Sequence, residues 1–166
     1  MKKSSLLFIC ISVLLFSCDK ENASNSPISG GITNQSECKN NKSFTGNLDI
    51  ADSLSCISYT YDASVQKLVL THYNAGFNCC PGNIYCEIES YNDSIVVTEY
   101  ETRQDCNCLC LFDLEIELNG VQAKNYKIIF KEPYVDNQQE LIFNIDLAFF
   151  NQGDYCVVRK EYPWGP

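Results

Sequence analysis

The sequence predicts an all-β protein, an antiparallel β-sandwich of about eight strands, from three observations. From Cys56 onward, apolar and polar residues alternate with a period of two rather than 3.6. Beyond the first 17 residues, no segment shows a convincing helical stripe. The connections between apolar runs are short, which suits antiparallel neighbours. An immunoglobulin-like sandwich is one form of this prediction, although the Cys-Trp-Cys spacing of those domains is absent, and a small β-barrel is the alternative.

Residues 1–17 predict a signal peptide. Two lysines precede an 11-residue apolar run from Leu6 to Phe16, which is too short to span a bilayer as a helix. A Leu and a small Ser stand at minus three and minus one before Cys18. This pattern resembles the lipobox of bacterial lipoproteins, in which the cysteine is acylated and becomes the first residue. We therefore expect Cys18 to be lipidated and to anchor the chain in the bacterial envelope. The expected location is the outer membrane, and the sequence does not distinguish its periplasmic face from its cell-surface face.

The remaining chain is predicted to consist of a tether and one domain. Residues 18–36 are polar, with Ile28 and Ile32 as the larger apolar residues, and are expected to be a flexible tether. Residues 37–166 have a length typical of one β-sandwich domain. Processing at Cys18 leaves ten basic and 21 acidic side chains, a formal charge of −11. This charge argues against nucleic acid as a partner and against electrostatic adsorption to anionic lipid.

Alternation and β-branched residues define the predicted strands. Asn92-Asp93 is suited to a two-residue hairpin turn, and Asn119-Gly120 is the strongest short turn signal, so we expect successive hairpins. The predicted strands are Cys56 to Asp62, Val65 to His72, Ile84 to Glu89, Ser94 to Glu101, Cys108 to Leu118, Asn125 to Lys131, Glu140 to Phe149 and Tyr155 to Arg159.

Nine cysteines remain besides Cys18, and an oxidising envelope favours disulfides among them. The alternation of Cys106, Cys108 and Cys110 predicts that all three face the core from one strand. The group around Cys79-Cys80 is expected to meet them, with the pairing left open. An odd number leaves at least one thiol without an intramolecular bridge. The disulfide candidates are Cys38, Cys56, Cys79, Cys80, Cys86, Cys106, Cys108, Cys110 and Cys156.

A metal site is the alternative use of these thiols. Thiolates and one imidazole suit Zn²⁺ or Cu(I), although the Cys-x2-Cys spacing of zinc ribbons is absent. His72 shares a face with Leu68 and Leu70, where a core or edge histidine bonded to the backbone is the commoner finding. No catalytic motif is found, so we expect a protein that is not an enzyme and has no cofactor. The residues of the alternative metal site are His72, Cys79, Cys80, Cys86, Cys106, Cys108 and Cys110.

The layout resembles that of small, uncharacterised lipoproteins of Bacteroidota. The resemblance rests on the lipobox, the polar tether and a cysteine-rich β domain containing Phe77-Asn78-Cys79-Cys80 and Cys106-Asn107-Cys108-Leu109-Cys110. It implies a location in the envelope and carries no activity over to particular residues. We expect a membrane-anchored, disulfide-stapled binding or structural module, with a protein or glycan as partner. A lipoprotein that binds Zn or Cu is the second hypothesis.

Overall fold

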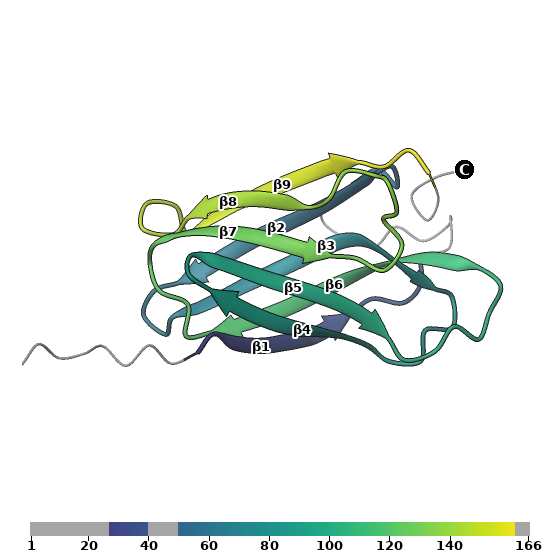
Figure 1. Ribbon diagram of the computed structural model, residues 1–166, viewed down its shortest axis with the longest axis horizontal. Coiled ribbons are helices and arrows are strands. Elements are labelled where there is room, and N and C mark those ends of the chain that lie inside the picture. Colours follow the sequence, from purple (N-terminus) through teal and green to yellow (C-terminus); the bar gives the residue numbers. More distant parts are fainter. Residues whose placement is uncertain (1–26, 40–49, 162–166) are drawn as a thin grey trace, which may run out of the picture.

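A computed structural model describes residues 27–39 and 50–161 as two β-sheets packed face to face (Figure 1). The first sheet, sheet A, has five strands in the order β1 (Ser29–Gln35), β6 (Leu109–Asn119), β3 (Lys67–Asn78), β2 (Leu54–Asp62) and β9 (Gln152–Val158). The second, sheet B, has four in the order β4 (Ile84–Tyr91), β5 (Ser94–Glu101), β7 (Asn125–Lys131) and β8 (Ile142–Asp146). The predicted β-sandwich is confirmed, and the alternative of a closed barrel is not. None of the described residues forms a helix long and apolar enough to cross a membrane.

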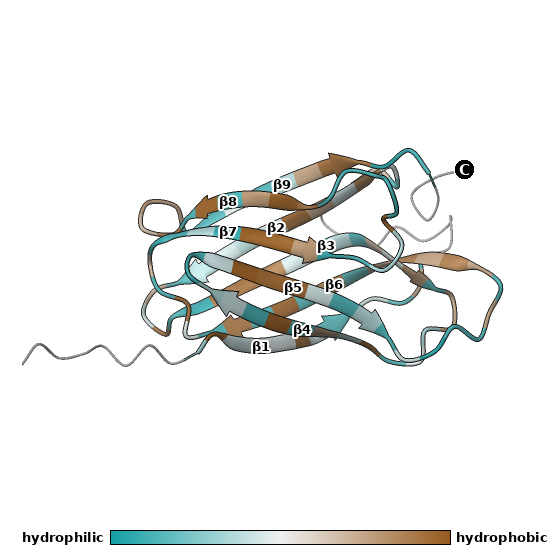
Figure 2. Cartoon of the chain, viewed as in Figure 1, coloured by the Kyte–Doolittle hydropathy of each residue, from teal (hydrophilic) through white to brown (hydrophobic). Residues whose placement is uncertain are grey.

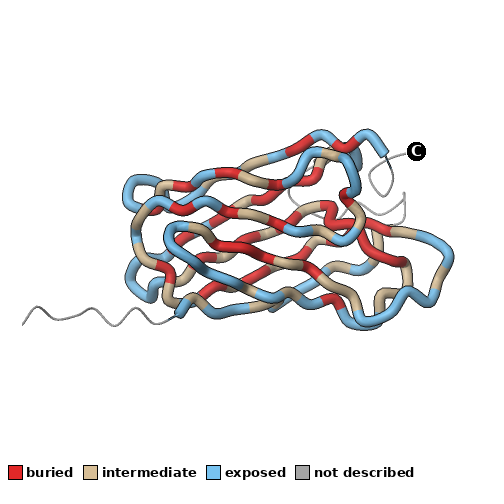
Figure 3. The backbone as a smooth tube through the Cα atoms, viewed as in Figure 1, coloured by how far each residue is buried: buried red, intermediate tan, exposed pale blue. Residues whose placement is uncertain are grey.

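The predicted alternation supplies the core between the sheets. Leu68 and Leu70 of β3 are fully buried and belong to one apolar cluster with Ile128 and Phe130 of β7. The same segments are apolar in Figure 2 and buried in Figure 3, while the turns at both ends are mostly exposed. A second, smaller cluster forms around Phe77 of β3 and Phe112 of β6. Each sheet therefore buries one face, as the period of two requires.

A β-bulge in β3 changes which residues face inward. The register with β6 shifts between His72 and Ala75, and Asn74 there has a positive φ of 60°. Before the bulge the inward residues are Leu68, Leu70 and His72, and after it Ala75 and Phe77 are buried in the smaller cluster. The extra residue thus places both His72 and Phe77 in the interior.

The predicted turns are only partly correct. Asn92-Asp93 joins β4 to β5 as a two-residue hairpin, with Tyr91 opposite Ser94. The chain also turns after Asn119, where Gly120 has a φ of +79°, but it then crosses from sheet A to sheet B instead of forming a hairpin. In addition, β7 pairs with β5 in parallel, so sheet B is mixed. Immunoglobulin sheets are antiparallel, so this arrangement differs from theirs.

The ninth strand, β1, lies inside the segment that was predicted to be a flexible tether. β1 pairs with the edge of β6, and Ile28 and Ile32 pack against the core. An edge strand needs only one hydrogen-bonded ladder, here with β6, and one apolar face. Ile28 and Ile32 supply the apolar contacts despite the polar composition around them. The prediction that the tether extends to residue 36 is therefore wrong, and the β domain includes Ser29.

The two ends of the sandwich differ. The first, which we call the Ser29 end, carries the start of β1, the β2–β3 turn (63–66), the Asn92-Asp93 turn and the β8–β9 loop (147–151), all on the left in Figure 1. The opposite end carries the loop between β3 and β4 and the loop between β5 and β6. It holds three disulfides, and we call it the disulfide end. The described chain therefore begins at one end, and most of its disulfides lie at the other.

Candidate functional site

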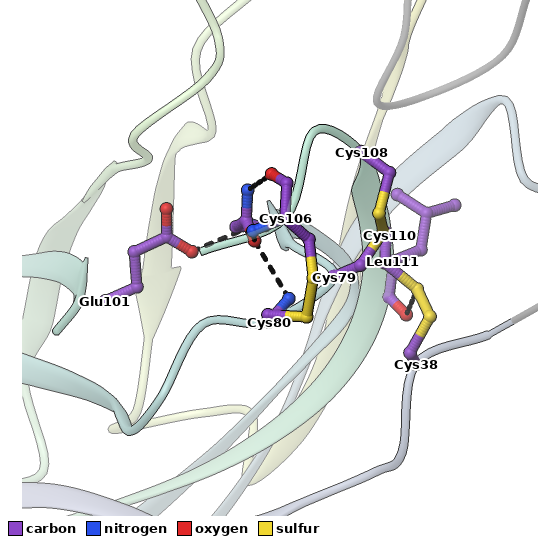
Figure 4. The surroundings of a disulfide bond; sticks show 9 residues. Cys38, Cys79, Cys80, Glu101, Cys106, Cys108, Cys110 and Leu111 are labelled. Carbon is purple, nitrogen blue, oxygen red and sulfur yellow. Dashed lines mark hydrogen bonds between the residues drawn. A yellow bond between two sulfur atoms is a disulfide. The ribbon is translucent and has the colours of Figure 1, made fainter. Parts of the chain in front are cut away.

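The cysteine groups meet at the disulfide end, as predicted. Cys79 and Cys80 follow β3 and bond to Cys108 and Cys106, with Cα–Cα distances of 5.6 and 5.4 Å (Figure 4). The third disulfide joins Cys110 to Cys38, which is 72 residues away in the sequence. Only two bridges therefore connect the two cysteine groups. Because antiparallel segments approach each other here, the earlier cysteine of one group bonds to the later cysteine of the other.

The three cysteines of residues 106–110 do not share one inward face, which corrects the prediction. β6 begins at Leu109, so Cys106 and Cys108 lie in the preceding loop, and Cys108 is exposed. Cys110 is buried. Disulfides to Cys79 and Cys80 hold the loop outside the strand, and its residues therefore do not follow the alternation of a ladder.

Asn78 ties the disulfide end together by hydrogen bonds to Cys80, Cys106 and Glu101. Its Oδ1 accepts from the backbone N–H groups of Cys80 and Cys106 at 2.9 and 3.2 Å, and its Nδ2 donates to the Cys106 carbonyl at 2.6 Å. The Asn78 N–H donates to Glu101 Oε2 at 2.8 Å, and Tyr134 donates its hydroxyl proton to the other Glu101 oxygen. Burial, followed by this carboxylate, raises the pKa of Tyr134 to about 12. Two loops are thus fixed to each other by covalent and polar bonds.

The fourth disulfide lies elsewhere, between neighbouring strands of sheet A. Cys56 and Cys156 are directly opposite in the β2–β9 ladder, and their Cα atoms are 4.1 Å apart. Cys86 is the free cysteine among the described residues. Burial raises the pKa of the Cys86 thiol to about 11, and the charge of Glu99, directly opposite it on β5, acts in the same direction. A half-buried thiol with this pKa is a poor nucleophile and a poor metal ligand at neutral pH.

The seven residues of the alternative metal site do not form one set of free ligands. Cys79, Cys80, Cys106, Cys108 and Cys110 are all in disulfides, so their sulfurs are not thiolates. Within residues 27–39 and 50–161, no group of three or more His, Cys, Asp or Glu side chains could hold a metal ion. His72 is a core histidine, but its partners are side chains rather than the backbone.

His72 is the centre of a buried polar cluster that joins the two sheets. Its Nδ1 lies 2.8 Å from Glu99 Oε1, across the interior on β5, and its Nε2 lies 2.9 Å from Ser55 Oγ on β2. Glu132, which follows β7, places Oε1 at 3.6 Å from the same Nε2. The other Glu132 oxygen pairs with Arg159 at 2.6 Å. Sheet A therefore contributes the basic groups of this cluster, and sheet B contributes the two carboxylates.

The carboxylates favour the charged imidazole. Burial by itself would lower the pKa of His72, but the charge and hydrogen bond of Glu99, together with the charge of Glu132, outweigh it, and the pKa is raised above 6.5. Burial also raises the pKa of Glu132, although His72 and Arg159 oppose that effect. With His72 protonated and both glutamates ionised, the four groups have no net charge. Neutrality of this kind is what permits charges in an apolar core.

The Ser55–His72–Glu99 contacts join the same atom types as the nucleophile, base and orienting acid of serine hydrolases. Ser55 and His72 are both 0% exposed, whereas a nucleophile must be reached by its substrate. In the protonated form that the carboxylates favour, both imidazole nitrogens are donors, so Nε2 in that form gives a hydrogen bond to Ser55 Oγ and does not accept its proton. This arrangement can hold the two sheets together through hydrogen bonds and ion pairs.

Sequence reasoning identified His72 and missed its partners, Ser55, Glu99, Glu132 and Arg159. One signal was available in the predicted strand that contains Glu99. Because Glu99 follows Ile95 and Val97 at alternate positions, the period of two places its carboxylate on the same buried face as these two residues. Glu132 and Arg159 lie just beyond strand ends, where alternation no longer reports orientation. Comparison with known protein families, with curated proteins and with solved structures finds no match to this chain.

Proposed function

We propose that this protein is a lipid-anchored, non-enzymatic module of the bacterial envelope whose disulfide end binds a protein or glycan partner. The anchor is Cys18, which lies outside the described residues, and the lipobox pattern before it supports this role. The observation that carries the proposal is the position of three disulfides at the end opposite the start of β1. A domain anchored upstream of Pro27 presents that end away from its anchor.

The surface of the disulfide end is polar, exposed and held in place. Thr102 donates its backbone N–H to the Asn83 carbonyl and Arg103 donates to the Pro81 carbonyl, both at 3.0 Å, so the two loops run side by side. Gly82 has a φ of +68°, and a Cβ there would lie 2.5 Å from Thr102 Oγ1. Loops that are already ordered lose less conformational entropy on binding, which favours a recognition surface.

Exposed residues of the β5–β6 loop supply the groups for recognition. Arg103 and Asp105 form an exposed ion pair at 3.3 Å, which a partner can open at little cost. Gln104 and Asn107 add amide groups that donate and accept hydrogen bonds, as sugar hydroxyls and peptide groups require. This composition favours a polar partner. The metal-binding alternative is supported by no comparable group of free ligands among the described residues.

The test of the anchor and disulfides is an intact mass of the protein purified from membranes. We expect acyl mass on Cys18 and, after unfolding and alkylation without reductant, one modified thiol. Four or more modified thiols together with bound Zn or Cu would contradict the proposal and favour the metal-binding alternative. Cys18→Ser is expected to leave a folded domain that no longer partitions into the detergent phase.

The test of the binding end is photocrosslinking in intact cells. A photoreactive side chain is placed at Gln104, in the exposed loop, and in a matched variant at Glu89, on the exposed face of β4. Specific adducts from position 104 alone are expected. Equal adducts from both positions, or none from position 104, would refute recognition through the disulfide end.

A further inference from the structure

The Ser29 end carries an unusual number of exposed apolar side chains. The described residues have six exposed large hydrophobic side chains, and four of them lie at this end. Phe149 is 81% exposed and Phe150 63%, both in the β8–β9 loop, while Val65 in the β2–β3 turn is 62% and Tyr91 at the end of β4 is 54% exposed. We call these four residues the apolar rim. Clustering at one end distinguishes them from apolar residues scattered singly on a surface.

The tip that carries the two phenylalanines is built to present them. The Asp146 carbonyl accepts from the N–H groups of Phe149 and Phe150 at 3.3 and 2.9 Å, and the Asp146 side chain accepts from Ala148 N–H at 3.1 Å. Leu147 is buried and fixes the start of the loop. At the far side of the loop, the Asn151 carbonyl accepts a hydrogen bond from the backbone N–H of Tyr61 at 2.7 Å. The tip is therefore ordered, and its rings point outward without a cover from the described residues.

The arrangement of the rim suits a flat partner. The β2–β3 turn, which carries Val65, and the β8–β9 loop, which carries Phe149, are neighbours, because residues 61–64 and residues 147–149 and 151 line one hollow. Tyr91 belongs to a different turn at the same end, as the β4–β5 connection in Figure 1 shows. The rim therefore spans three separate loops at one end of the sandwich. A planar surface can contact them together.

We propose that the apolar rim docks on the bilayer in which the protein is anchored, with Phe149 and Phe150 in the interface region. This inference rests on the proposed lipid anchor. Eleven positions separate Cys18 from Ser29, and a chain of that length reaches at most about 40 Å even when fully extended. Because Ser29 starts β1 at the rim's own end, acylation at Cys18 keeps this end of the domain near the lipid.

The chemistry of the rim agrees with this occupant. Aromatic side chains are favoured at the boundary between headgroups and acyl chains. The mature chain has a formal charge of −11, so attraction to anionic headgroups cannot supply the contact and apolar groups must. Lys124, a basic residue near this end, is already paired with Asp93 at 2.7 Å.

The experiment places tryptophan at the rim of the acylated protein. Trp164, the single tryptophan of the chain, is first replaced by phenylalanine. Phe149→Trp is then compared with the matched control Val158→Trp, because Val158 is 58% exposed and lies at the far end of β9. Both variants are reconstituted in phosphatidylcholine vesicles with and without lipid brominated near the headgroup, separated by flotation, and measured by fluorescence. Phe150→Trp serves as a second probe of the same tip.

We expect brominated lipid to remove at least about half of the Phe149→Trp fluorescence and less than about a tenth of that of Val158→Trp, because interfacial side chains lie roughly 5–10 Å deep. Flotation with equal quenching of the two variants overturns docking and leaves the anchor standing. Failure to float overturns the anchor and docking together. A floating but unquenched chain that crosslinks to itself through the rim would assign this surface to a second copy instead.

Discussion

Replacing the buried His72–Glu99 pair tests whether the polar cluster acts as one ionic unit. In His72→Leu, two carboxylates remain in the interior with Arg159 as the cation of the cluster, and Glu99 Oε2 already lacks a hydrogen-bond partner. Leucine fills most of the space beside Phe130, whose ring centre lies 5.3 Å from that of His72. The cost therefore comes mainly from charge rather than from a cavity.

The expected size follows from the burial of the pair. Both side chains are 0% exposed, and removing one partner of such a pair costs about 3–5 kcal/mol. For a domain of this length, that free energy corresponds to a fall in Tm of roughly 10–20 °C. In the double variant His72→Leu with Glu99→Leu, the Arg159–Glu132 pair remains and is neutral by itself. We expect the double variant to cost less than the sum of the single variants, by about 0.5–3 kcal/mol.

The assay is equilibrium unfolding in urea at pH 6, followed by circular dichroism with the disulfides intact. The wild type, both single variants and the double variant form one thermodynamic cycle. If the loss of unfolding free energy in the double variant equals the sum of the losses in the two single variants, the pair does not act as one ionic unit. A single His72→Leu cost below about 1 kcal/mol, the range of exposed ion pairs, would refute it as well.

Further predictions concern pH, the disulfides and the free thiol. Because the folded state raises the pKa of His72, its stabilising contribution is complete below about pH 6.5 and is lost as the pH rises through the folded value, so the unfolding free energy should fall on the alkaline side in the wild type and much less in His72→Leu. Glu132, also raised by burial, acts with the same sign from its ordinary value of 4.5 upward. Removing Cys56–Cys156, which closes 100 residues, should cost up to about 4.7 kcal/mol in chemical denaturation. Removing Cys79–Cys108 should cost much less, because the nested Cys80–Cys106 bridge already closes 26 of its 29 residues, and the reverse order would contradict the loop-entropy argument. With a pKa of about 11, roughly one Cys86 thiol in a thousand is ionised at pH 8, so native protein should react with iodoacetamide far more slowly than unfolded protein, and equal rates would be inconsistent with the described burial.

Local patterns in the sequence predicted most strands but few of their neighbours. Alternation and turn chemistry located β2 to β9 and the Asn92-Asp93 hairpin, since both depend on residues close in the chain. The same Asn-Gly signal at 119–120 marks a turn, yet it does not determine which sheet receives the next strand. β1 was missed because its partner is 90 residues away at Asn119, and nothing near Ser29 reports that ladder.

For the buried cluster around His72 too, local pattern predicted the position of one residue but not its partners. A period of two placed His72 on the core face correctly. Its partners come from β2, β5 and the segment after β7, so their approach depends on how two sheets pack, which a single strand does not encode. Likewise, the abundance of cysteine predicted disulfides, while the choice of Cys38 for Cys110 depends on the path of the chain after β1.

The pairing of β9 with β2 bears on how such a chain crosses a membrane. Sheet A is completed only when Gln152–Val158 reaches β2, about 100 residues after β2 itself has emerged. For a chain exported from its N-terminus, as we propose here, β2 therefore lacks its edge partner until residues 152–158 have also crossed the membrane. Sheet A can therefore be completed only after β9 has been exported, and the Cys56–Cys156 disulfide can form only then.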